Sequence, residues 1–148
     1  MTNDDRKSIV DYELHKARLN YEQAGLAKDN HYWDLVANRL YYALFHAVSA
    51  LLIHNEIPVK SHKGAVVMFN KHCVKTGLVP VDEGYILSYL QSKREEADYN
   101  CFTEIKQSDI EPIIEKSLNL INLIESFIKS DIRLIQDDKE DTSSLKTI

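Results

Sequence analysis

Apolar residues recur at three- and four-residue spacing along most of this chain, which is the pattern of helices with one apolar face. The pattern predicts five helices and no strand, over about residues 5–28, 31–55, 61–77, 82–98 and 108–128. The loops between them are short, so we expect an all-α, up-and-down antiparallel bundle of about five helices.

The second predicted helix is apolar around most of its circumference. Leu35, Tyr42 and Phe45 lie on one side, and Leu44 and Val48 lie on the next. One neighbouring helix cannot cover so wide an apolar stripe. This helix is therefore either central to the bundle or packed against a partner on its second side.

Local signals predict where the later helices begin and end. Ser61 is a candidate N-cap for the third helix, which should stop at Gly77 and Pro80. A capping-box pattern of Ser108 and Glu111 precedes the last helix, and the adjacent Pro112 leaves its first turn open to a cap at Glu111 or an irregular start. We expect one domain over residues 1–135 and a disordered polar tail over 136–148.

Composition narrows the class of protein. The 148 residues carry 18 Lys and Arg against 23 Asp and Glu, a formal charge of −5, which disfavours a sequence-blind nucleic-acid coat. The polar first residues and the interrupted apolar run at 43–53 disfavour secretion and membrane insertion. Cys73 and Cys101 stand apart, without a redox or zinc-knuckle spacing, so a reducing cytoplasm fits best.

No cofactor or metal signature is present in the sequence. Phosphate-binding glycine motifs, the G-x-S-x-G elbow and H-E-x-x-H are all missing, and the six histidines have no recognised ligand spacing. We therefore expect no cofactor, no metal, and histidines scattered over the surface.

The segment Asn38-Arg-Leu-Tyr-Tyr-Ala-Leu-Phe-His46 is the most informative one. Arg39 and His46 are seven residues apart, so in a helix they lie about 20° apart in azimuth and roughly 10 Å apart along the axis. A cation and an imidazole on an apolar helix require a cleft or polar partners. The structural alternative is that Arg39 pairs with Asp98 or Glu95, and that His46 hydrogen-bonds a backbone carbonyl or a tyrosine.

Two further groups of charged residues stand out. Arg94 and Asp98 are four residues apart and so are neighbours on one helix face. The span 60–75 has four lysines and no acidic residue, which makes it the local basic patch of an acidic chain. The patch is either a phosphate-binding surface or a solvated face. Its candidate nucleotide- or RNA-binding residues are Lys60, His62, Lys63 and Lys71.

Three blocks occur in a recognisable order: Asn38 to Ala47, then Ser61-His-Lys-Gly64, then Arg94-Glu-Glu-Ala-Asp-Tyr99. With this order the chain resembles the HEPN domain family over about residues 5–130, and it is most similar to the short stand-alone prokaryotic members often paired with a minimal nucleotidyltransferase.

The resemblance implies a homodimer in which the Arg-x(4–6)-His motifs of two chains meet at one cleft. It also implies a metal-independent endoribonuclease, in some members the toxin of a toxin–antitoxin pair. Arg39 and His46 match the motif and are the candidate catalytic residues. Leu40 stands directly after the arginine, where the family often has a polar residue. The candidate supporting residues are Asn38, Tyr42, Arg94, Asp98 and Tyr99.

RNA cleavage is the leading hypothesis. The alternative is a non-catalytic HEPN protein that binds a nucleotide or a nucleotidyltransferase through the same cleft, and a purely structural dimer comes third.

Overall fold

A computed structural model describes residues 1–100 and 102–134, without the side chain of Asp98. It contains α1 (Asn3–Asp29), α2 (Trp33–His54), α3 (His62–Phe69), the π-helical turn η1 (Asn70–Val74), α4 (Val81–Tyr99) and α5 (Gln107–Lys129). The described residues form no strand, so the all-α prediction with five helices is confirmed. Cys101 and the predicted tail at 136–148 lie outside the described residues.

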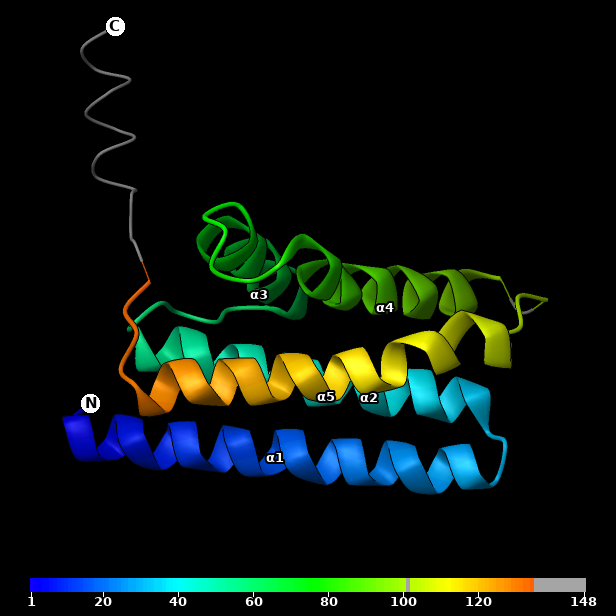
Figure 1. The fold of residues 1–148 in the computed structure, drawn as a ribbon, viewed down its shortest axis with the longest axis horizontal. Helices are drawn as coiled ribbons and strands as arrows, with labels where there is room; N and C mark the ends of the chain where they lie inside the picture. Colours follow the sequence, from blue (N-terminus) through cyan, green and yellow to red (C-terminus); the bar gives the residue numbers. More distant parts are fainter. Residues whose placement is uncertain (101, 135–148) are drawn as a thin grey trace, which may run out of the picture.

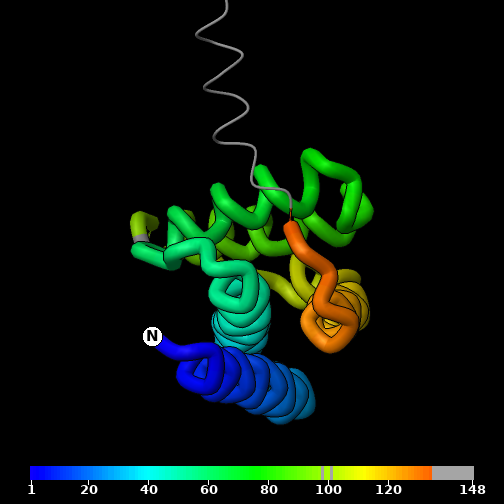
Figure 2. Tube along the Cα trace, turned by 90° about the vertical axis from the view of Figure 1, so that its left-hand side faces the viewer, coloured from blue at the N-terminus to red at the C-terminus, as the bar shows by residue number. Residues whose placement is uncertain are grey.

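The helices form an up-and-down bundle. In Figure 1, α1 and α2 run antiparallel along the long axis, and α4 and α5 form a second antiparallel pair. Figure 2 shows the layers end on: α1 lies on one side of α2, α5 lies beside α2, and the segment of α3 and α4 covers the opposite side. α2 therefore contacts each of the four other α-helices, α1, α3, α4 and α5.

The central position of α2 accounts for its apolar circumference. Leu40, Leu44, Leu51 and Leu52 are fully buried within the one chain. By length and composition α2 could cross a membrane, but 67% of its most apolar stretch is buried inside the bundle. Of the two explanations open from the sequence, the central position is sufficient, because α2 has the burial of a core helix.

The helix boundaries differ from the predicted ones for local reasons. α1 begins at Asn3, not near residue 5, because Thr2 and Asp5 form a reciprocal capping box with two hydrogen bonds of 3.0 Å. α2 begins at Trp33, not at 31, because His31 has a left-handed backbone (φ 60°) that no helix continues.

The structure confirms one of the helix caps predicted for the later helices and contradicts the other. Ser61 caps α3 as predicted: its hydroxyl accepts a hydrogen bond of 2.9 Å from the Gly64 N–H. The predicted capping box of Ser108 and Glu111 is wrong, because α5 begins at Gln107 and the Asp109 carboxylate accepts from the Lys106 N–H at 2.9 Å. Pro112 therefore lies inside the helix.

Candidate active site

Arg39 lies on α2 and is held by side-chain oxygens of uncharged residues. Its guanidinium donates to Asn38 Oδ1 at 2.6 Å and 3.1 Å, to Asn20 Oδ1 at 2.8 Å and to Gln23 Oε1 at 3.3 Å. The pairing with Glu95 offered as a structural alternative is not formed, and among the described side chains no carboxylate makes an ion pair with Arg39. The arginine is therefore positioned by hydrogen bonds to neutral side chains, and within the described part of the chain its positive charge is not neutralised.

His46 lies two turns further along α2 and is held by a carboxylate. Its Nδ1 lies 2.6 Å from Oε2 of Glu13, a residue of α1, and both side chains are 20% exposed. The carbonyl or tyrosine partner expected for His46 is thus replaced by an acidic residue that sequence reasoning missed. Because Nδ1 is engaged, Nε2 is the ring nitrogen left to face a ligand.

Tyr42 lies between the arginine and the histidine. The Arg39 guanidinium carbon is 5.3 Å from the Tyr42 ring centroid, and the His46 ring centroid is 6.5 Å from it. Arg94, from α4, is 5.0 Å from the rings of both Tyr41 and Tyr42. Two guanidinium groups from different helices therefore flank the same tyrosine.

His62 joins this group from the first turn of α3. Its ring stacks on Phe45 at 4.0 Å between centroids with an interplanar angle of 8°, and its Nδ1 lies 3.1 Å from the Tyr41 hydroxyl. Partial burial, and then the charges of Arg94 and His46, lower the pKa of His62 below its ordinary value. Burial is also the main cause that raises the pKa of Tyr41, so its hydroxyl keeps its proton.

These side chains form one group, which we call the Arg/His cluster: Arg39, Tyr42, His46, His62 and Arg94. A surface cavity of about 310 Å³ opens beside it and is lined by Tyr41, His62, Lys63, Gln91, Arg94 and Glu95. The cluster combines two cations, two imidazoles and a tyrosine ring, and its residues come from the three helices α2, α3 and α4.

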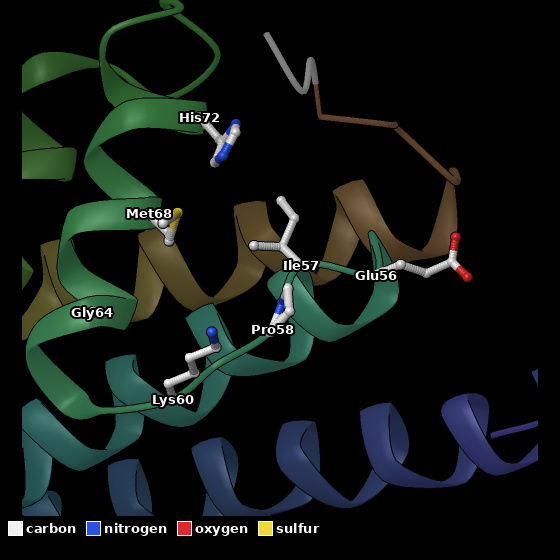
Figure 3. Close-up of a pocket in the computed structure, with 7 residues that line it drawn as sticks. All are labelled: Glu56, Ile57, Pro58, Lys60, Gly64, Met68 and His72. Atoms are coloured by element: carbon white, nitrogen blue, oxygen red, sulfur yellow. The ribbon is translucent and has the colours of Figure 1, made fainter. Parts of the chain in front are cut away.

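The predicted basic patch is divided between two places. His62 and Lys63 lie at the cavity beside the cluster. Lys60 lines a different cavity of about 240 Å³, together with Ile57, Met68 and His72 (Figure 3). Lys71 lies on η1, next to the buried His72. One continuous surface over all four predicted residues is therefore not formed.

The remaining predicted residues lie in separate parts of the structure. Asn38 is a partner of Arg39, whereas Tyr99 at the end of α4 is 91% exposed and makes no ring contact. His72 is only 3% exposed, so the expectation of surface histidines is wrong for this residue. Within residues 1–100 and 102–134, no group of three His, Cys, Asp or Glu side chains could hold a metal ion.

The arrangement of the cluster suits chemistry at a phosphate. A guanidinium whose charge is not neutralised can bind a phosphate oxygen and stabilise charge that develops on it. An imidazole whose second nitrogen is held by a carboxylate can exchange a proton in a fixed direction. Leu40, directly after Arg39, is fully buried and takes no part, and Asn38 on the other side of the arginine supplies the polar contact.

Comparison with known proteins places this chain in a family. A model of the HEPN domain matches residues 10–127. A "UPF0332 protein" of Thermotoga maritima is 30% identical over 84% of this chain and 95% of its own length. Two proteins of Methanocaldococcus jannaschii named "Putative toxin MJ0142" and "Putative toxin MJ0605" are each 28% identical, over 88% and 87% of this chain and 88% and 96% of their own lengths. The chain therefore belongs to the HEPN domain family.

Proposed function

We propose that this protein is a metal-independent endoribonuclease that cuts RNA at the Arg/His cluster. The observation that carries the proposal is the pairing of Arg39, whose charge no described carboxylate neutralises, with His46, whose Nδ1 is fixed by Glu13, on either side of Tyr42. A buried arginine with a purely structural role is usually paired with a carboxylate.

The chemistry uses the ribose 2′-hydroxyl as the nucleophile. His46 exchanges a proton with the reacting oxygens through Nε2, and Arg39 stabilises the negative charge that grows on the phosphate. DNA lacks the 2′-hydroxyl and is not a substrate of this reaction. No step requires a metal ion.

The names of two relatives bear on the biological role of the proposed cleavage. Two of them carry names that call them toxins, which supports growth arrest as the consequence of RNA cleavage by this chain. We propose that the protein acts in the cytoplasm as a homodimer that brings two Arg/His clusters to one cleft, and that a minimal nucleotidyltransferase holds it in check.

A second candidate function is binding without cleavage. Lys63 and Arg94 line the same cavity beside stacked aromatic rings, and such a site holds a phosphate and a base without any proton transfer. In this function the protein is a HEPN partner that binds a nucleotide or a nucleotidyltransferase.

The test uses purified wild type, Arg39→Ala and His46→Ala with mixed RNA in EDTA, after light scattering has shown that all three share one oligomeric state. We expect cleavage by wild type and a loss of about 100-fold or more in each variant. A wild type that binds RNA or a nucleotide and cleaves no RNA would favour the second candidate. Equal cleavage by all three proteins would mean a contaminating nuclease.

A further inference from the structure

We infer that His62 is the second acid–base residue of the Arg/His cluster, working opposite His46 in the cleavage of RNA. This inference rests on the proposed function and assigns its two proton transfers to two different imidazoles of one chain. The Arg-x(4–6)-His motif itself contains only one of them.

The two imidazoles share the aromatic neighbours Phe45 and Tyr42, which places them at one site. His62 stacks on Phe45 at 4.0 Å between centroids, and the His46 ring centroid lies 5.6 Å from the same ring. Both also contact Tyr42, at 5.7 Å for His62 and 6.5 Å for His46. The guanidinium carbons of Arg39 and Arg94 lie 5.3 Å and 5.0 Å from the centroid of the Tyr42 ring, so two cations and two imidazoles surround this one tyrosine.

Each imidazole is fixed through Nδ1, but by a group of different character. Glu13 places a carboxylate on His46, which stabilises the positive charge that this ring carries while it holds a proton for delivery. Tyr41 places a neutral hydroxyl on His62, and when Nδ1–H donates to that oxygen, Nε2 is a proton acceptor. The geometry therefore suits His46 as the acid and His62 as the base.

The electrostatic surroundings of His62 point in the same direction. The titratable and charged groups around it are Tyr41, Tyr42 and His46 from α2, Lys63 from its own helix, and Arg94 with Glu95 from α4. Burial first, and then the charges of Arg94 and His46, lower the pKa of His62, which favours the neutral imidazole. An imidazole must be neutral to accept a proton as a general base.

The reaction balances as a transfer within the RNA. His62 Nε2 takes the proton of the 2′-hydroxyl, the 2′ oxygen bonds to phosphorus, and the bond from phosphorus to the 5′ oxygen breaks with its electron pair. His46 gives its proton to that oxygen. The products are a 2′,3′-cyclic phosphate and a 5′-hydroxyl, and exchange with water restores both imidazoles.

The test compares two substrates that differ in their leaving group. One is a short RNA, and the other is a uridine 3′-phosphodiester of p-nitrophenol, whose leaving group needs no proton. With RNA in EDTA, His62→Ala and His46→Ala should each cleave about 100-fold more slowly or worse. With the activated ester, His46→Ala should recover most of the wild-type rate, whereas His62→Ala should not.

Two control variants separate chemistry from folding. His62→Asn keeps a polar atom opposite the Tyr41 hydroxyl but accepts no proton, so it should be as slow as His62→Ala. His15→Ala removes an exposed histidine on α1 and should cleave at the wild-type rate. In wild type, the rate should rise with pH along a limb that both His62 variants lose.

The outcomes distinguish failure of the inference about His62 from failure of the proposed ribonuclease function. Wild-type cleavage that His62→Ala leaves unchanged would overturn this inference and leave the ribonuclease standing. Recovery of His62→Ala by the activated ester would overturn the assignment of His62 as the base. A wild type that cleaves neither substrate would overturn the proposed function and this inference together.

Discussion

Glu13 lies 33 positions before His46 in the chain, and yet its carboxylate fixes the direction in which that imidazole points. It comes from α1, which runs antiparallel to α2 and lies beside it, as Figures 1 and 2 show. At the residue scale, the cluster is thus built from short-range and long-range contacts together: Asn38 holds Arg39 from the adjacent position, while Asn20 and Gln23 hold it from α1.

Replacing Glu13 with Gln tests the role of that carboxylate. The amide preserves size but removes the negative charge that supports a protonated His46, so we expect RNA cleavage to fall by about 10-fold or more. The measurement is the cleavage rate of a labelled RNA in EDTA. The matched control is Glu22→Gln, at an exposed position of the same helix, which should leave the rate unchanged. Equal rates for Glu13→Gln and wild type would show that Glu13 only packs against the ring.

Cys73 supplies a residue-scale prediction that concerns stability. Burial raises the pKa of its thiol from 9.0 to about 12, so the folded protein holds a proton that the unfolded chain releases between these values. The free energy of unfolding should therefore fall as pH rises above 9.0, by at most about 1.4 kcal/mol per pH unit from this group. Below pH 9 the thiol should make no contribution to the pH dependence.

The measurement is urea unfolding at several pH values between 8 and about 10.5 in wild type and Cys73→Ala. The buried tyrosines titrate in both proteins, so the difference in slope isolates the thiol. Parallel curves for the two proteins would contradict a strongly raised pKa.

At the scale of elements, two helical glycines have opposite surroundings. A Cβ at Gly84, in α4, would clash with the side chain of Val74, so this glycine lets α4 approach η1 closely. A Cβ at Gly25, in α1, would meet nothing within 4 Å. Gly84 therefore allows close packing of α4 against η1, whereas Gly25 only lowers the stability of α1.

We therefore expect Gly84→Ala to lower the free energy of unfolding by about 1–3 kcal/mol, because β-branched Val74 cannot easily move aside. Gly25→Ala should raise it by about 0.5–1 kcal/mol. Urea titrations of both variants provide the comparison. Adding Val74→Ala to Gly84→Ala should remove the clash, and a double variant with no such coupling would show that α4 tolerates the methyl group by itself.

The elements also show what the sequence can predict. Helical periodicity predicts the five helices because each buries an apolar face. Ser61 marks the start of α3 through its side-chain cap, and Gly77, with its positive φ, marks the turn that follows η1. The contact of Glu13 with His46 is different, since it depends on how two helices are rotated against each other. The stacking of His62 on Phe45 depends in the same way on the path of the chain from α2 to α3.

At the scale of the whole molecule, the distribution of charge matters more than its sum. The chain carries a formal charge of −5, yet Arg39, Arg94 and Lys63 lie at or beside the Arg/His cluster. The predicted basic patch contributes to this region only in part, because Lys60 lines the separate cavity of Figure 3. An RNA strand should therefore be attracted to one face of an otherwise acidic protein.

Two lysines three positions apart provide the test. Lys63→Ala should weaken binding of a single-stranded RNA and make the plot of log affinity against log salt less steep by about 0.7, the value for one lost phosphate contact. Lys60→Ala removes the same charge from the protein but not from that face, so both affinity and slope should stay near those of wild type. Fluorescence anisotropy over a range of salt concentrations, in the inactive His46→Ala background, measures both quantities. Equal losses in the two variants would mean that RNA responds to the net charge of the molecule, and that the cluster has no electrostatic role in capturing it.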